Sequence, residues 1–202
     1  MAVKDHSLDE KIVKSAKAEF MKFGFQKASL YKIADNAGLT TGALYTRYKN
    51  KDDLFCSLVS GVTEKIYSKI MPVQDMYEDV YKNPTAEKML IAIRKEKEIY
   101  LEVLFEYYDE CMLLFCKSDG TSIEKKIKEL TELKSKQTID FLKNISQKET
   151  DLSVIEFIMS GQFYFYRQIL EKGYDKEKTL SCMETVEFFL ESGWKALFDR
   201  II

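Results

Sequence analysis

The scarcity of helix breakers constrains the fold of this chain more than any other feature. Its 202 residues include only two prolines, Pro72 and Pro84, and no run of alternating apolar and polar residues marks a set of half-buried strands. Apolar residues make up 46% and charged residues 32% of the chain, a balance typical of a globular protein rather than a disordered one. The sequence therefore predicts an all-α fold.

Two short helices joined by a tight turn are predicted near the N-terminus. Ser29 is placed to cap the first of them, and Gly38 is placed to end it in a left-handed turn. Thr40 then caps the second helix, so the turn has the sequence Ala-Gly-Leu-Thr over residues 37–40. Two helices joined by a three- or four-residue turn with a glycine are typical of a helix-turn-helix motif.

A second glycine, Gly42, lies inside the second of these helices, where it costs about 1 kcal/mol relative to alanine. Leu44 is expected to face the first two helices, whereas Gly42, Tyr45, Thr46 and Lys49 form one outward strip. A bare backbone position, two hydroxyls and an ammonium suit a surface that enters a DNA groove, where phosphates and base edges are within reach. The alternative is a glycine that is merely tolerated in a short surface helix.

Charge is distributed unevenly along the chain. Residues 1–52 hold 10 Lys and Arg against 6 Asp and Glu, and residues 53–202 hold 21 against 27. A basic N-terminal segment on an acidic body fits a protein whose one end approaches a polyanion. Lys51 lies at the start of the next predicted helix, against the preference of the helix dipole, and a phosphate neighbour would explain it.

The first 55 or so residues closely resemble the DNA-binding domain of the tetracycline-repressor (TetR) family of bacterial transcription regulators. The resemblance rests on Phe23-Gly24, on the capping Ser29 and on the run from Ile33 to Leu54. It implies a homodimer with a helix-turn-helix domain in 1–52, and a ligand-binding and dimerisation domain in 53–202 for a small-molecule effector. By position it implies DNA-backbone contacts and base-edge contacts on a double-stranded operator. The backbone set is Ser29, Thr40, Tyr45, Lys49 and Lys51, and the base-edge set is Thr41, Gly42 and Thr46.

The body is expected to contain long helices with two boundaries inside it. A helix over 53–71 is predicted to end before Pro72, because proline disrupts a helix interior. The stretch from 85 to 118 is predicted to be one helix or a helix broken near the charged residues 94–98. Its second half is apolar on nearly all sides, which suits either a plain core helix or the lining of an apolar effector pocket. The candidate lining residues are Tyr100, Leu104, Tyr107, Tyr108, Cys111, Met112 and Phe115.

The last two predicted helices carry more apolar surface than one core requires. Such helices can bury the excess against a second copy of the chain in a four-helix bundle, or both can pack inside one protomer. The candidate interface residues follow the helical 3,4 spacing: Ile155, Met159, Gln162, Phe163, Tyr166, Met183, Val186, Leu190, Trp194 and Leu197.

Several function classes are disfavoured by what the sequence lacks. The single histidine, His6, and four cysteines without paired ligand spacing predict no metal site. No nucleophile elbow or phosphate-binding loop occurs, so we expect neither catalytic residues nor a cofactor. No signal-peptide pattern or long apolar run occurs, which predicts a cytoplasmic protein without a membrane partner. The main alternative to a ligand-responsive repressor is a helical protein-interaction adaptor that does not bind specific DNA.

Overall fold

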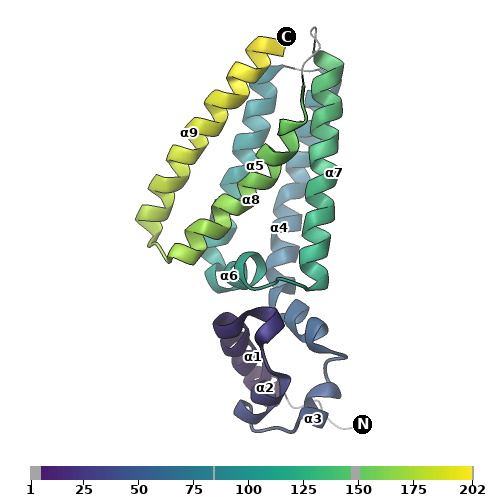
Figure 1. The fold of residues 1–202 in the computed structure, drawn as a ribbon, viewed down its shortest axis with the longest axis vertical. Coiled ribbons are helices and arrows are strands. Elements are labelled where there is room, and N and C mark those ends of the chain that lie inside the picture. The colour runs from purple at the N-terminus through teal and green to yellow at the C-terminus, as the bar shows by residue number, and fades with distance from the viewer. Residues whose placement is uncertain (1–5, 84, 147–150, 202) are drawn as a thin grey trace. The chain divides into compact units, whose positions relative to one another are not determined.

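The computed structural model describes residues 6–83, 85–146 and 151–201, and every regular element within these ranges is an α-helix (Figure 1). This confirms the predicted all-α fold. None of the helices in these ranges is long and apolar enough to cross a bilayer. In chain order they are α1 (His6–Lys27), α2 (Leu30–Asn36), α3 (Thr41–Tyr45), α4 (Lys51–Lys82), α5 (Ala86–Glu106), α6 (Tyr108–Cys116), α7 (Ser122–Ile145), α8 (Val154–Lys172) and α9 (Lys176–Ile201).

The chain divides into two compact units. The first comprises Met1–Thr63 and Asp109–Ile127, and the second comprises Glu64–Tyr108 and Lys128–Ile202. Helices α4 and α7 each contribute residues to both units. The predicted DNA-binding segment 1–52 lies within the first unit, which also includes most of α6 and the start of α7.

An aromatic cluster holds the first unit together. Phe20 and Phe55 are fully buried, with ring centroids 5.1 Å apart, and Phe25 lies 5.6 Å from Phe55. The segment from Asp109 onward joins this unit through backbone and side-chain bonds. The Phe25 amide donates to the Lys117 carbonyl over 2.8 Å, and the Ser122 amide donates to Asp52 Oδ1 over 2.8 Å.

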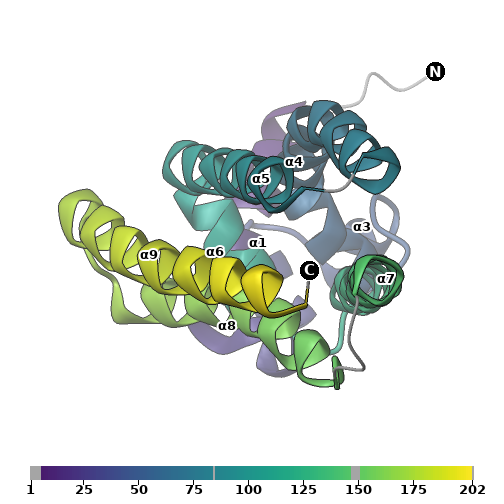
Figure 2. The same ribbon diagram turned by 90° about the horizontal axis from the view of Figure 1, so that it is seen from above.

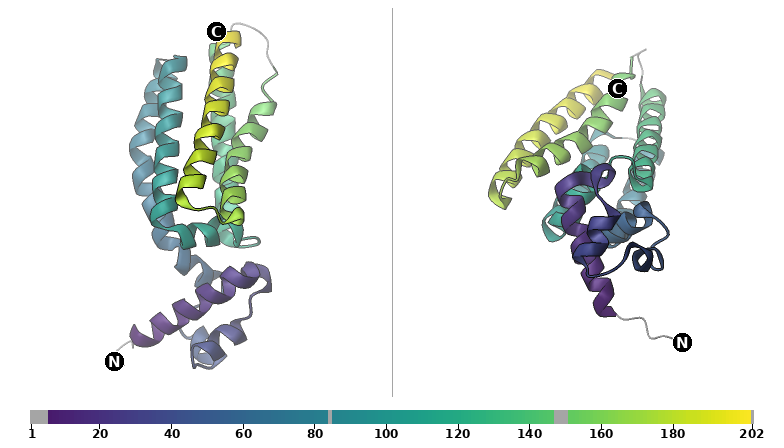
Figure 3. Two further views of the ribbon diagram at one scale, coloured as in Figure 1. Left: turned by 90° about the vertical axis from the view of Figure 1, so that its left-hand side faces the viewer. Right: turned by 60° about the horizontal axis from the view of Figure 1, so that its bottom comes forward.

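The second unit is a bundle of long helices. Helices α8 and α9 lie side by side in the views of Figures 2 and 3, and α9 also packs along α5. Gly173, with φ +62°, ends α8 in the left-handed conformation, which favours glycine. The main core cluster contains Val80, Met89, Phe141, Leu142, Leu152, Ile155, Trp194 and Phe198.

Two predicted helix boundaries are wrong. Helix α4 continues through Pro72 to Lys82, because its buried face runs through the proline: Ile70 and Val73 are both buried on either side of it. That burial offsets the roughly 3 kcal/mol that a proline costs in a helix interior. The second break falls at Tyr107, whose backbone leaves the helical region at φ −125° and ψ 48°. Residues 94–98 stay helical because Arg, Lys and Glu are strong helix formers.

Candidate nucleic-acid interface and ligand cavity

Side-chain caps define the helix-turn-helix motif. Ser29 Oγ accepts a hydrogen bond from the Lys32 amide over 3.4 Å, and Thr40 Oγ1 accepts one from the Ala43 amide over 3.2 Å. Gly38 adopts φ +72° between the two helices, a conformation that favours glycine. The predicted caps and turn are therefore confirmed, and α3 begins where the sequence places it.

The outer face of α3 is open to solvent. Gly42, Tyr45, Thr46 and Lys49 are all exposed, with Tyr45 52% accessible, and Thr41 is half-buried. Leu44 is buried on the opposite side. A Cβ added at Gly42 would meet only Thr40 Oγ1, at 3.8 Å, which is an ordinary van der Waals distance. Packing within the protein therefore gives no reason for a glycine at this position.

Helix α3 is fixed to α1 and α2 from its inner side. Arg47 Nε donates to Asp9 Oδ1 over 2.8 Å, and Ser15 Oγ in α1 donates to the Ile33 carbonyl in α2 over 2.9 Å. Glu19, a buried carboxylate, accepts from the Ser29 amide over 3.0 Å. The Arg47–Asp9 bond ties the end of the five-residue α3 to α1, and the other two bonds hold α1 against α2. Sequence pattern alone does not indicate these roles of Arg47, Asp9 and Glu19, since contacts between residues 10 to 38 positions apart leave no local signal.

Some predicted DNA contacts have partners inside the protein. Thr46 Oγ1 donates to the Ala43 carbonyl over 2.7 Å, which leaves its lone pairs outward. Lys51 Nζ donates to the Gln26 carbonyl over 3.0 Å and lies 5.0 Å from the centre of the Phe25 ring. Burial lowers the pKa of Lys51. Contacts within the first unit thus also account for a cation at the start of α4, and the phosphate contact of Lys51 stays a prediction.

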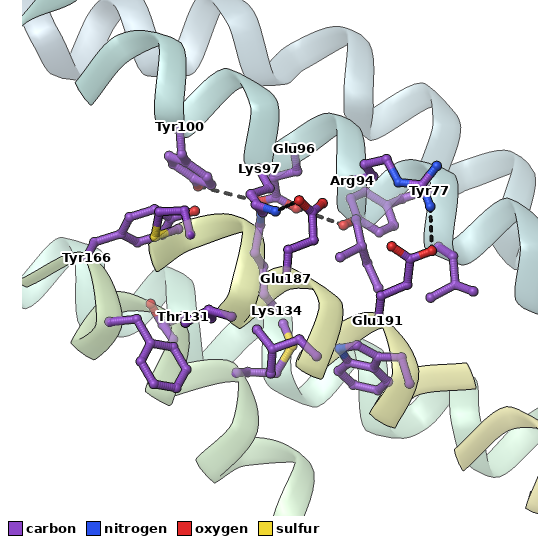
Figure 4. Close-up of a pocket in the computed structure, with 18 residues that line it drawn as sticks. Tyr77, Arg94, Glu96, Lys97, Tyr100, Thr131, Lys134, Tyr166, Glu187 and Glu191 are labelled. Atoms are coloured by element: carbon purple, nitrogen blue, oxygen red, sulfur yellow. Dashed lines mark hydrogen bonds and ion pairs between the residues drawn. The ribbon is translucent and has the colours of Figure 1, made fainter. Parts of the chain in front are cut away.

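The second unit contains a cavity of about 90 Å³, and a smaller one of about 40 Å³ shares part of its lining. The larger cavity lies among α4, α5, α7, α8 and α9 (Figure 4). Its apolar lining consists of Leu90, Ile93, Met159, Phe165, Met183, Val186, Leu190 and Trp194. An apolar cavity with a few polar groups is typical of small-molecule sites, although ligand pockets of 300–1,000 Å³ are usual.

Charged side chains in the larger cavity occur in pairs. Figure 4 shows Glu187 and Glu191 of α9 directed toward α5, where they pair with Lys97 and Arg94 respectively. Lys134 of α7 pairs with Glu96 of α5. Burial lowers the pKa of Lys97 to about 8, although Glu191 acts in the opposite direction.

Two tyrosines also hold Glu96. Tyr77 Oη donates to Glu96 Oε2 over 2.7 Å, and Tyr100 Oη donates to Glu96 Oε1 over 3.4 Å. Burial, with Glu96 alongside, raises the pKa of both tyrosines, so they remain hydrogen-bond donors at neutral pH. Glu96 thus has three donors and is fixed within the cavity wall.

Of the seven predicted ligand-binding residues, the cavities bring in only Tyr100. Leu104 is buried in α5, Tyr107 ends that helix, and Tyr108 begins α6. Cys111, Met112 and Phe115 belong to the first unit and line neither cavity. The apolar pattern favoured the second half of the 85–118 stretch. The signal that points to the cavity is the one-turn spacing of Arg94 and Lys97 opposite that of Glu187 and Glu191.

The predicted dimer residues whose side chains the structure describes lie on the inward side of α8 and α9. Ile155, Tyr166, Met183 and Trp194 are buried within the protomer, and Met159, Val186 and Leu190 line the larger cavity. Leu197 packs against the main core cluster. Gln162 and Phe163 are predicted residues whose side chains lie outside the described part of the chain. The prediction that the buried residues form an interface is corrected, because they are already covered by the protomer's own helices.

The outward side of the same two helices carries large exposed aromatics. Phe157 and Tyr164 of α8 are 74% and 60% accessible, and Phe188 and Phe189 of α9 are 76% and 73% accessible. Apolar side chains of this size and exposure on neighbouring helices are typical of a surface that another protein covers. In the described residues, no group of three His, Cys, Asp or Glu side chains is arranged to hold a metal ion.

Comparison with known proteins bears on the first unit. Residues 12–58, which contain the helix-turn-helix motif, match the sequence model of the bacterial regulatory proteins of the tetR family. Residues 12–58 are therefore similar to the DNA-binding segment of tetR-family regulators. An uncharacterised HTH-type transcriptional regulator of Bacillus subtilis, YhgD, is 25% identical over 159 residues, which cover 76% of this chain and 80% of YhgD.

Solved structures of TetR-like regulators share the fold over nearly the whole chain. A TetR-like transcriptional regulator from Rhodococcus sp. RHA1 superposes with a TM-score of 0.61 at 16% identity, covering 97% of this chain and 98% of that one. The fatty acid degradation regulator FadR from Bacillus halodurans has a TM-score of 0.53 at 19% identity, covering 92% and 98%. These solved structures thus share the all-α fold of this chain, in which a helix-turn-helix segment is followed by a helical body.

Proposed function

We propose that the protein is a homodimeric repressor, without catalytic activity, that binds a pseudo-palindromic operator and is released by a small molecule. The observation that carries the proposal is the outer face of α3, where exposed polar side chains surround a glycine that the protein's own packing does not require. A helix of this kind can lie closely in a major groove. Two copies would place their α3 helices one helical turn of DNA apart, roughly 34 Å.

The residues of the motif divide by the chemistry they offer to DNA. Thr41, Gly42 and Thr46 are proposed to lie over base edges, with Thr46 accepting through its outward lone pairs because its proton is donated to Ala43. Ser29, Thr40, Tyr45 and Lys49 are proposed to face the sugar-phosphate backbone. Ser29 and Thr40 also cap their helices, so their loss would weaken both the fold and the contact. Lys51, whose ammonium also donates to the Gln26 carbonyl, is proposed as a further backbone contact.

The proposed dimer surface is the outward face of α8 and α9, centred on Phe157, Tyr164, Phe188 and Phe189. Each side chain is more than half accessible in the protomer, and fully burying one such aromatic contributes about 1.5–3 kcal/mol. In a symmetric dimer formed through this face, each contact between the two protomers would occur twice, once on each side of the two-fold axis.

Release by an effector is proposed to start in the cavity of the second unit. The cavity-lining residues Tyr77 and Thr131 belong to α4 and α7, the two helices that also contribute residues to the first unit. A ligand that binds one arrangement of these helices better than another shifts the equilibrium by its difference in affinity. The proposed consequence is a changed separation of the two α3 helices and weaker operator binding.

The salt dependence of DNA binding tests the proposed interface. The affinity for a pool of random duplexes should fall steeply as salt rises, and Lys49→Gln should lower the slope of log affinity against log salt by about one per protomer. Lys95→Gln is the matched control, because Lys95 is an exposed lysine of α5 that pairs with Glu98 in the second unit. Equal slopes for Lys49→Gln and Lys95→Gln would contradict the placement of α3 on DNA.

A further inference from the structure

Trp194 is the chain's single tryptophan and is buried in the wall of the larger cavity. Only 4% of its surface is accessible, yet its indole Nε1 has no hydrogen-bond acceptor in the described part of the chain. A buried donor without an acceptor is costly, and most buried donors in native proteins are satisfied. An acceptor brought by a bound molecule would satisfy it.

Trp194 also lines the smaller cavity. The two cavities share Tyr77, Ile93, Glu96, Lys134, Met159 and Trp194 in their linings. A molecule that occupies the larger cavity therefore lies beside Trp194, and movement of the shared side chains would extend its space toward the smaller cavity. Each cavity alone holds only a few heavy atoms.

The charges of the cavity are already balanced. Each of the three cations that line it has a carboxylate partner: Arg94 with Glu191, Lys97 with Glu187, and Lys134 with Glu96. Lys97 Nζ is buried without a well-formed hydrogen bond, but its ion pair with Glu187 compensates its charge. A charged ligand would have to break one of these pairs and leave a buried charge uncompensated, whereas a neutral ligand would not.

From this combination we infer that the effector is an uncharged, mainly apolar molecule whose acceptor oxygen, such as that of a ketone or an ester, accepts a hydrogen bond from Trp194 Nε1. The inference rests on the proposed function, since it assigns a chemical class to the effector of the same cavity. It also assigns Trp194 as the residue that distinguishes an oxygenated ligand from a hydrocarbon of the same shape.

Four small probes of similar shape test the inference: ethylbenzene, acetophenone, 1-phenylethylammonium and 2-phenylpropionate. Because the chain has one tryptophan, protein labelled with ¹⁵N gives one indole N–H resonance, which reports on Trp194 directly. Titrations are made on DNA-free protein. We expect acetophenone to move this resonance downfield relative to ethylbenzene, and both ions to bind at least about tenfold more weakly than acetophenone.

Trp194→Phe removes the donor and keeps an aromatic ring. Calorimetry should show that ethylbenzene affinity is retained, while the ratio of acetophenone affinity to ethylbenzene affinity falls about five- to tenfold, as expected for one neutral hydrogen bond. An unchanged ratio would overturn the role of Trp194. Tighter binding of either ion would overturn the neutral class, and no response to any probe up to its solubility limit would overturn the cavity as the site.

DNA binding is measured separately on the same proteins. If Trp194→Phe binds duplex DNA as tightly as the parent protein, the variant is folded. A changed ratio of acetophenone affinity to ethylbenzene affinity is then due to the lost N–H donor. A negative result in the probe titrations would contradict the effector inference but not the DNA-binding proposal. Absence of salt-dependent DNA binding by the parent protein would contradict only the DNA-binding proposal.

Discussion

Replacing Gly42 by alanine separates the stability of the helix-turn-helix domain from its function. Alanine is favoured over glycine by about 0.8–1.0 kcal/mol in a helix interior, and the added Cβ would meet only Thr40 Oγ1 at 3.8 Å. Since Gly42 lies in the first turn of α3, we expect Gly42→Ala to raise the free energy of unfolding by about 0.5–1 kcal/mol. Urea denaturation followed by circular dichroism measures this change.

The same methyl group should weaken specific DNA binding. If the backbone at Gly42 lies against a base edge, an added Cβ separates the two surfaces and removes contacts worth about 1–3 kcal/mol, which corresponds to roughly a 5- to 150-fold loss of affinity. Fluorescence anisotropy on a duplex selected by the parent protein measures the loss.

Gly61 provides the matched control for this variant. It lies in α4, is exposed, and has open space where a Cβ would be added. Gly61→Ala should therefore stabilise the first unit by a similar amount and leave DNA affinity unchanged. Parent-like DNA affinity in Gly42→Ala, or a loss of stability, would refute the reasoning about close approach.

Three further predictions concern base reading, assembly and pH. Thr46→Ala should change the preferred bases at one position of each half-site, whereas Tyr45→Ala should lower the affinity for all DNA sequences to a similar degree. Parallel binding-site selections compare the two variants. Identical effects of the two substitutions would contradict the assigned roles. Phe189→Glu should yield a monomer in analytical ultracentrifugation. The control Tyr67→Glu, at a similarly exposed aromatic residue of α4, should remain a dimer. A dimeric Phe189→Glu would refute the proposed dimer surface. Burial lowers the pKa of Lys97 to about 8, so above that pH the unfolded chain binds more protons than the folded chain. The free energy of unfolding of the parent protein should therefore rise between pH 7.5 and 9.5 relative to that of Lys97→Met. Free energies of unfolding that change in parallel for the two proteins across this window would contradict the prediction.

The elements that the sequence predicted well are those decided locally. A serine or threonine cap needs only the amide three residues later, and Gly38 needs only its own backbone conformation. The helix-turn-helix motif is composed of such signals, so its limits could be placed without knowledge of the rest of the fold.

The elements that were missed depend on tertiary contacts. Pro72 lies inside α4 because buried residues on both sides of it keep the helix intact. Helices α8 and α9 carry apolar residues on two faces, so periodicity alone could not decide which face packs inside the protomer. The cavity was misplaced for a related reason: its lining mixes apolar side chains with paired charges, and those pairs join helices about 90 residues apart in sequence.

Selection of binding sites from a library of random duplexes by the purified protein tests the central claim most directly. The account predicts enrichment of an inverted repeat whose half-site centres are about one helical turn apart, with affinity that falls steeply as salt rises. Absence of any enriched sequence, in protein shown to be folded and dimeric, would contradict the claim that this chain is a sequence-specific repressor.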